Sequence, residues 1–373
     1  MVDNVLRTEI TTLDEREAVN HMRENLHKDH LAGITFFCSD KYDLELLAQL
    51  IVEAYDCPVI GCTTAGEIGS TYQNDGIVAA SFSSNSFNFH IETINNLDTF
   101  SSITALEIAK KIKTQLRFSE RFDVNEMFGF LLIDGLSMME EHVAADLHSA
   151  LCGVKIIGGS AGDSLTFTKT SVFSGGKFQS GTAAIALIES KANFKVFKEQ
   201  HYTPSNMEMT ITKADPARRI VYEIDGGTAA IELAEIIGVN KDKLSMEVYS
   251  IYPVMLQVGD EWYVRSIQNY NEDGSLTFAC AIDSGLPLTV GKCEGLSKSL
   301  SKQVKELVSQ FDHIEMTLGF DCIHRRLEIL EMDIKNEVEE ILTPLNFLGF
   351  STYGEQYDAI HVNQTLTGVV IGA

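Results

Sequence analysis

One short motif occurs three times in this chain and limits the folds that the chain can adopt. The copies lie at residues 58–67 (PVIGCTTAGE), 155–163 (KIIGGSAGD) and 347–355 (FLGFSTYGE), and we call them the first, second and third corners. In each corner an apolar run leads into a glycine, then into small or hydroxylated residues, and finally into glycine and a carboxylate. Three such copies in similar surroundings indicate a recurring structural unit.

Similar elements surround the first two corners. Each corner follows a strand-like run and an amphipathic helix, and each is followed by two more strand-like runs. In chain order these elements are 34–37, 43–55, 76–82 and 87–91 around the first corner, and 128–133, 138–151, 181–187 and 194–197 around the second. The N-terminal half is therefore predicted to be an internal duplication, with modules at about 31–95 and 127–200. The third corner is predicted to close a separate C-terminal half.

The remaining pattern predicts the fold class. Further helices are expected at residues 12–30 and 99–116, and in the second of these Ile103, Leu106, Ile108 and Ile112 are predicted to face inward. Pro204 interrupts the pattern and marks a boundary between domains 1–204 and 205–373. Strand-rich halves with few long helices predict an α/β (α+β) fold of two layered domains with mixed or antiparallel sheets.

Charge and composition exclude several classes of protein. The chain has 373 residues, of which 53 are acidic and 29 basic, for a net charge of −24. A surface this acidic repels phosphate backbones and anionic lipids, so we expect neither nucleic-acid binding nor membrane binding. No apolar run approaches the roughly 20 residues of a membrane span, and no secretion signal is recognised. The protein is expected to be cytoplasmic.

The chain resembles the FIST family of sensory modules over nearly its whole length. In the N-terminal part the resemblance rests on VIGCTTAGEI, IIGGSAGD and GTAAIALI, and in the C-terminal part on RRIVYEIDGGTAAIEL, FDCIHRR, FSTYGE and HVNQTLT. It implies paired N- and C-terminal FIST domains that bind small ligands and pass the signal to kinases, cyclases or chemoreceptors.

A subset of that family, which this chain resembles in being a stand-alone double domain, consists of haem-binding nitric oxide sensors. The resemblance thus implies a bacterial sensor with haem b as its cofactor. Its partner would be a histidine kinase or a cyclic-di-GMP enzyme, either a diguanylate cyclase or a phosphodiesterase. A homodimer is left open.

The corners are the first candidate ligand site. Glycines at strand ends let a backbone approach a ligand closely, while hydroxyls and carboxylates supply donors and acceptors. This set suits a polar or zwitterionic molecule such as an amino acid. The alternative is that the glycines only form tight turns that the acid caps. The candidate residues are Gly61, Cys62, Thr63, Thr64, Gly66, Glu67, Gly159, Ser160, Gly162, Asp163, Ser351, Tyr353, Gly354 and Glu355.

Histidines are the candidate ligands for haem iron. His324 is the first choice because it follows an apolar strand-like run and precedes Arg325 and Arg326. Strand alternation would turn one guanidinium toward the same face, where it could pair with a propionate. His361 and His201 are the alternatives, and for each histidine a structural role is the competing interpretation.

Catalysis is a third hypothesis. Ser160 lies in GGSAG, which fits the Gly-x-Ser-x-Gly pattern of hydrolases, and Cys62 lies in a glycine-flanked turn. The residues after Ser160 do not predict the helix that such a nucleophile requires, and the corners share no nucleophile. We therefore expect that the protein is not an enzyme.

Overall fold

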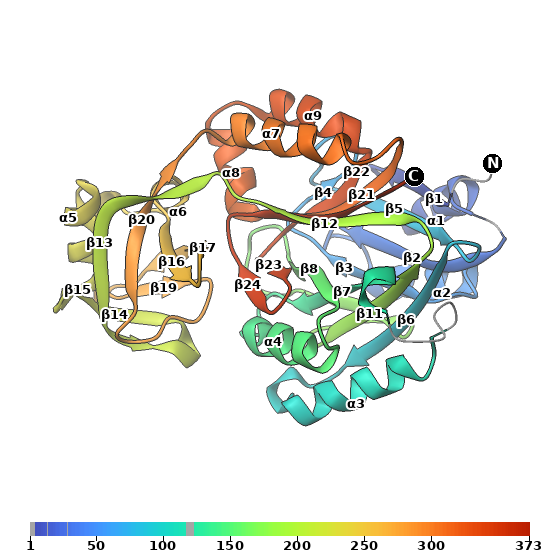
Figure 1. Cartoon of the computed structure of the whole chain (residues 1–373), viewed down its shortest axis with the longest axis horizontal. Coiled ribbons are helices and arrows are strands. Elements are labelled where there is room, and N and C mark those ends of the chain that lie inside the picture. Colours follow the sequence, from blue (N-terminus) through green and yellow to red (C-terminus); the bar gives the residue numbers. More distant parts are fainter. Residues whose placement is uncertain (1–3, 13, 28, 117–122) are drawn as a thin grey trace.

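The computed structural model describes residues 4–12, 14–27, 29–116 and 123–373. Figure 1 shows a larger body in which sheets are covered by helices, with a smaller lobe on one side. We define the lobe as residues 202–293 and the body as the described residues before and after it. The chain crosses between them twice, at residues 201–202 and 293–294.

The body contains three sheets of similar construction. In spatial order, sheet 1 holds β1 (Val5–Ile10), β5 (Ile77–Ser83), β2 (Leu31–Cys38), β3 (Val59–Thr63), β9 (Val172–Ser174) and β10 (Lys177–Gln179). Sheet 2 holds β6 (Phe87–Ile94), β11 (Ala183–Ser190), β7 (Met127–Asp134), β8 (Lys155–Ala161), β23 (Glu355–Tyr357) and β24 (Ile360–Val362). Sheet 3 holds β12 (Asn193–Glu199), β25 (Leu366–Gly372), β21 (Ile314–Cys322), β22 (Phe347–Thr352) and β4 (Glu67–Ile68). Each has one parallel pair (β2–β3, β7–β8 or β21–β22) among antiparallel neighbours, so the predicted mixed α/β fold is confirmed.

The sheets are built from three repeated units, namely the modules at about 31–95 and 127–200 and a third unit at residues 314–372, and these units exchange strands around a ring. The strand that follows each corner leaves its own unit: β4 pairs with β22, β9 with β3, and β23 with β8. The last strands also move, because β6 joins β11 of the second unit and β12 joins β25 of the third. The N-terminal strand β1 pairs with β5 and occupies the matching place in sheet 1.

The third corner is therefore part of the body, and the expectation that it closes a separate C-terminal half is wrong. Its strands β22 and β23 are hydrogen-bonded to β4 and β8, which come from the first 200 residues. The boundary at residue 204 stays a prediction. In space the chain leaves the body beside that residue and returns at residue 294.

Helices cover the outer faces of the three sheets. They are α1 (Glu15–Asn25), α2 (Leu44–Ala54), α3 (Ser102–Lys113), α4 (Glu140–Ala150), α7 (Leu296–Val308), α8 (Ile323–Glu331) and α9 (Lys335–Leu342). Short 3-10 turns lie at η1 (Leu97–Thr99), η2 (Val124–Glu126), η3 (Pro216–Arg218), η4 (Lys241–Lys243) and η5 (Thr343–Leu345). The start of α1 is capped by Asp14, whose side chain accepts from the main-chain N–H of Glu17. Leu13 and Lys28, within the helix predicted at 12–30, lie outside the described residues. No helix in the part of the chain that the structure describes is both long and apolar enough to cross a membrane.

The inward face predicted for the helix at 99–116 is partly wrong. Ile108 and Ile112 are buried, but Ile103 and Leu106 are 69% and 60% exposed. The buried face is completed by Ala105 and Ala109, which share the 3.6-residue period of the two isoleucines. Small alanines, rather than the larger residues, let α3 approach its sheet.

The core of the body lies where the three sheets meet. Phe37 from β2, Phe130 from β7 and Phe320 from β21 come from different sheets, and their ring centroids are 5.5 to 6.3 Å apart. All three side chains are fully buried. Aromatic contacts of this kind add to the stability that apolar burial provides. The rings therefore join the three units at their centre.

The lobe has antiparallel strands and a core of its own. Its strands are β13 (Tyr202–Asp215), β14 (Ile220–Ile224), β15 (Gly227–Thr228), β16 (Val254–Val258), β17 (Glu261–Arg265), β18 (Ile267–Tyr270), β19 (Leu276–Phe278) and β20 (Pro287–Cys293). Two helices, α5 (Ala229–Ile237) and α6 (Met246–Ile251), pack on them. The lobe thus lies between the second and third units of the body and contributes no strands to the sheets of the body.

The central rings predict where substitutions are most damaging. Phe320→Ala should lower the free energy of unfolding by about 3–5 kcal/mol, because it leaves a cavity between sheets. Leu106→Ala removes a large apolar side chain from the exposed face of α3 and should change it by less than about 0.5 kcal/mol. Urea unfolding measures both. If the two variants lost the same free energy of unfolding, the rings would not be what joins the sheets.

Candidate functional site

The three corners are joined to one another by main-chain hydrogen bonds. The donor–acceptor pairs are Ala65 N to Ser351 O (3.0 Å), Ser351 N to Gly66 O (2.7 Å), Gly162 N to Thr63 O (3.0 Å), Ser160 N to Gly354 O (2.8 Å) and Tyr353 N to Ser160 O (3.2 Å). Each corner thereby satisfies polar groups of the other two. The corners close the ring of exchanged strands, and most of their atoms lie inside the body.

The acidic residues of the first and third corners accept a hydrogen bond from a threonine of the same corner, and that threonine accepts from a main-chain N–H of the turn. Thr64 Oγ1 donates to Glu67 at 2.6 Å, and the hydroxyl of Thr352 donates to Glu355. Burial raises the pKa of Glu67 to about 7 and that of Glu355 to about 8. Asp163 differs. Burial would raise its pKa, but hydrogen bonds from the Tyr353 hydroxyl and nearby main-chain N–H groups hold it well below its usual value.

Two of the corner glycines cannot be replaced without strain. Gly66 and Gly354 have φ values of 129° and 135°, a region that other residues rarely adopt. A Cβ at Gly66 would lie 2.1 Å from Arg326 Nη1, and one at Gly354 would lie 2.2 Å from the ring of His361. These positions agree with the turn-forming interpretation of the corners. Whether the corners also bind a ligand stays a prediction.

The two candidate nucleophiles are completely buried. Ser160 Oγ accepts from Gln356 Nε2 at 2.9 Å, and the strand β8 ends at Ala161 without entering a helix. Cys62 lies in the middle of sheet 1, where burial raises the pKa of its thiol well above the usual value. Both side chains lie away from the cleft described below.

Arg325 and Arg326 are used in buried contacts inside the body. Arg325 donates from Nε to Asp321 (2.6 Å) and from Nη1 to Glu199 (2.7 Å), and Arg326 donates to the main chain of Gln73 (2.7 Å). The expected strand alternation here is wrong, because α8 begins at residue 323. The helix turns successive side chains by about 100°, so the guanidiniums point away from the side that His324 faces.

His201 belongs to a closed polar network at the crossing between body and lobe. Its Nδ1 lies 2.9 Å from Arg325 Nη1, and its Nε2 lies 2.9 Å from Glu328. Arginine can only donate, so Nδ1 accepts and Nε2 carries the proton. With Cys293 and Glu328, His201 forms the one group of potential metal ligands among the described residues. A metal on Nε2 would require the proton to move to Nδ1, against the guanidinium, so these residues fit a hydrogen-bond network better than a metal.

A cleft of about 190 Å³ lies between the body and the lobe. Its lining includes Met138, Phe167, His324 and Tyr353 from the body, and Arg218, Arg219 and Phe278 from the lobe. The cleft combines aromatic and aliphatic surface with a few polar groups, which is typical of sites for small molecules. Among the predicted site residues, the structure places His324 and Tyr353 in its wall.

His324 is the most unusual polar group in the cleft. Only 5% of the residue is exposed, and its Nε2 has no hydrogen-bond partner in the described structure. Burial lowers its pKa to about 4, against a smaller opposing effect of the nearby main chain of Ile267. The imidazole is therefore neutral at pH 7. A buried polar atom without a partner costs about 1–3 kcal/mol, which a bound ligand could offset.

Three residues that line the cleft have a backbone conformation that side chains seldom adopt. Met138, Phe167 and Arg219 have φ values of 57°, 52° and 55°, although none of them is glycine. Such conformations cost of order 1–3 kcal/mol each and concentrate at binding sites. Phe167 also stacks on Tyr353, with centroids 4.5 Å apart and planes at 19°. These two rings form one wall of the cleft.

Arginines of the lobe face the body across the cleft. Arg219 donates from Nη2 to Glu140 (2.5 Å) and Glu141 (2.7 Å), at the start of α4. Arg218 is exposed at the rim. One guanidinium thus holds the lobe against the body, while the other remains accessible to an anion.

His361 lies close to the cleft but does not line it. The residue is 1% exposed, and its Nε2 is 3.4 Å from the carbonyl of Ala279. Burial lowers its pKa to about 4. The neighbouring Asn363 reaches the cleft instead. The structure therefore brings neither His361 nor His201 together with His324.

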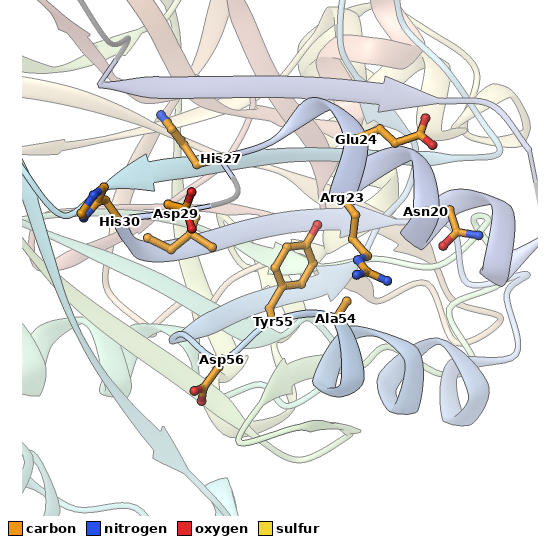
Figure 2. Close-up of a pocket in the computed structure, with 10 residues that line it drawn as sticks. Asn20, Arg23, Glu24, His27, Asp29, His30, Ala54, Tyr55 and Asp56 are labelled. Atoms are coloured by element: carbon orange, nitrogen blue, oxygen red, sulfur yellow. The ribbon is translucent and has the colours of Figure 1, made fainter.

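A second hollow of about 730 Å³ lies at the ends of α1 and α2, and Figure 2 shows its side chains. Arg23, Glu24 and Asp29 are exposed there and carry charges of both signs. The imidazole of His27 contacts Ser81 Oγ at 2.8 Å. The lining of this wide hollow is mostly polar or charged, and only Leu31, Ala54 and Tyr55 add apolar surface, so it suits a small molecule less well than the cleft does.

Sequence reasoning missed most of the cleft. Arg218 and Arg219 stood in the RRIVYEID motif without an assigned role, and Phe167 lay in the extra residues of the second module. A basic pair in an acidic chain is the one signal that could have indicated them. The strained backbone conformations leave no trace in the residue types.

Two family models match the chain, and the boundary between them lies inside the lobe. A model described as the FIST N domain matches residues 33–227, and a model described as the FIST C domain matches residues 229–358. A search among curated proteins finds no match.

The buried Glu355 predicts an unusual pH dependence. Its pKa in the folded protein, about 8, lies above the ordinary value of 4.5. Its contribution to stability is therefore complete below pH 4.5 and is lost as the pH rises toward 8, by up to about 1.4 kcal/mol per unit. Glu355→Gln keeps the neutral shape and should remove this loss. Denaturant unfolding at pH 4.5, 6 and 8 measures it, with exposed Glu331→Gln as the control. Parallel profiles for wild type and Glu355→Gln would contradict the assignment.

Proposed function

Because this chain belongs to the FIST family, whose domains are associated with small-ligand sensing in signal transduction, we propose that it is a sensor whose ligand binds in the cleft. The observation that carries the proposal is the unpartnered Nε2 of buried His324. Depending on the tautomer, the Nε2 of a neutral imidazole either donates one hydrogen bond or accepts one. A ligand in the cleft would supply the missing partner.

The ligand that suits the cleft is a small anion or zwitterion, such as an amino acid. Arg218 offers a guanidinium at the rim, and guanidiniums pair with carboxylates in bidentate fashion. Phe167, Tyr353 and Phe278 offer surface for an apolar part of the ligand. The volume of about 190 Å³ lies below the roughly 300–1,000 Å³ of sites for drug-sized ligands, which favours a small metabolite.

Haem-based sensing of nitric oxide is the second candidate function. It is favoured by the free, uncharged Nε2 of His324, which is a suitable donor for haem iron. Two other observations disagree with haem. The cleft is smaller than a porphyrin requires, and Arg325 and Arg326 are engaged with partners inside the body. The residues as placed therefore do not fit haem b, and we derive no step through it.

In this proposal the protein has no catalytic activity of its own and works in the cytoplasm. The signal would pass to a partner histidine kinase or cyclic-di-GMP enzyme, as the family resemblance implies. Two features support the passage of a signal. The first is that the cleft lies between the body and the lobe, which have separate cores. The second is that the helix that carries His324 also contacts both chain crossings, through Glu328.

The first prediction from this proposal concerns amino acids and small carboxylates. One of them should raise the melting temperature of the protein, with a stabilisation approaching about 2.7 kcal/mol at one hundred times Kd. His324→Ala should abolish this effect, and Arg218→Ala should weaken binding about tenfold for carboxylate ligands. His313→Ala, an exposed histidine in the body, is the matched control. A response that both His324→Ala and Arg218→Ala retain would place the ligand elsewhere.

The second prediction separates haem from the smaller ligands. Because the cleft is too small for a porphyrin, titration of the purified protein with haem should give no stoichiometric Soret band. Absorption spectra of wild type, His324→Ala and His313→Ala measure this. A stoichiometric band that only His324→Ala removes would favour haem and require the lobe to move away from the body.

A further inference from the structure

Helix α8 connects the cleft to the outer surface beside α7 and α9. His324 lies in its first turn and lines the cleft. Glu328, one turn later, contacts His201 and Cys293, which lie on the two chain crossings. Beyond these contacts the chain emerges at Leu330 and Met332, which are 54% and 52% exposed. One short helix therefore runs from the cleft, past the crossings, to exposed apolar side chains.

Those side chains lie beside a groove between α7 and α9. The groove has a volume of about 630 Å³ and is lined in its apolar part by Leu296, Met332, Ile334 and Ile341. In Figure 1, α7 and α9 lie side by side on the outside of the body, next to α8 and the lobe. Exposed methionine is common on surfaces that bind peptides, because its flexible side chain adapts to a partner. Apolar surface rimmed by polar residues is typical of an interaction site.

The two rims of the groove carry opposite charges. Lys298 of α7 lines one side, and Lys302 and Lys305 continue the same exposed face at helical spacing. Glu337 and Glu340 of α9 line the other side. In a chain with a net charge of −24, a row of three exposed lysines on one helix is notable. The groove therefore has an apolar stripe with lysines along one edge and glutamates along the other.

We propose that this groove binds an amphipathic helix of a partner protein. Helices bind such grooves through apolar residues at i, i+3 or i+4 and i+7. The charges of the rims select a helix with acidic residues along one side of its apolar stripe and basic residues along the other. Because Met332 is the C-cap of α8, an occupant of the groove would contact the end of the helix that carries His324. The inference goes beyond the proposed function and does not depend on which ligand the cleft takes.

The probe is a displayed library of 16-residue helical peptides. Apolar residues are fixed at i, i+4, i+7 and i+11, and the flanking positions are randomised among Glu, Lys and Gln. Selection on the full chain should enrich peptides with Glu on one flank and Lys on the other. A selected peptide, measured by fluorescence anisotropy, should bind at least tenfold more weakly to Met332→Glu. Ile103→Glu, which places the same change on exposed α3, should leave binding unchanged.

Charge reversal tests the orientation of the helix. Lys298→Glu should weaken the selected peptide, and a peptide with Lys in place of Glu on that flank should recover the affinity. Met332→Glu must keep the unfolding midpoint of wild type, which its 52% exposure leads us to expect. A library that yields no binder, or binders unaffected by both substitutions, would overturn the proposal. So would a dimer of the chain that sedimentation velocity detects and Met332→Glu dissociates, because the occupant would then be a second copy. If no ligand binds in the cleft but the selected peptide still binds in the groove, only the proposed sensor function is refuted.

Discussion

The buried guanidinium of Arg325 is the interaction on which the arrangement of body and lobe depends. It is 1% exposed and contacts carboxylates from two strands of sheet 3, Asp321 of β21 and Glu199 of β12. It also contacts His201, where the chain crosses into the lobe. Charges buried this deeply are tolerated only as a complete set, since losing one partner leaves the others uncompensated. The position of α8, and with it that of His324, is therefore set by electrostatics as well as by packing.

The repeated corners allowed the main features of the body to be predicted from the sequence. Their spacing indicated the units, and the strands and helices around the first two were placed correctly because period-2 and period-3.6 patterns are local properties. The exchange of strands could not be predicted. Pairings such as β22 with β4 and β23 with β8 join residues about 200 to 300 positions apart, and no pattern within either segment specifies its partner. The outward direction of Ile103 was missed because neighbouring alanines formed the buried face.

The candidate site was predicted only in part, and the reasons differ from residue to residue. His324, which was predicted as a ligand of haem iron, lines the cleft in the structure, but its two arginines were assigned to a strand when the segment is a helix. The motif FDCIHRRLEIL is short and apolar enough to suit either structure, and tertiary contacts decided between them. The hydrogen bonds of the corners to one another close the body, which agrees with the turn-forming alternative, and ligand binding by the corners stays a prediction. The position of the lobe arginines depends on the contact between lobe and body. The stacking of Phe167 on Tyr353 depends on the contact between the second unit and the third corner, and the sequence describes neither contact.

The strand exchange and the two adjacent chain crossings have opposite consequences for how the protein can change over evolutionary time. Each sheet of the body borrows strands from other units, so the loss of one unit would leave unpaired edges in the remaining sheets, and such edges promote aggregation. The three units can therefore be inherited only together. The lobe enters and leaves the body at neighbouring residues, since β13 and β20 pair Tyr202 with Cys293. A segment inserted in this way can be exchanged without rearranging the fold that carries it. Changes in the lobe can therefore alter one side of the cleft, while the side that holds His324 stays tied to the ring.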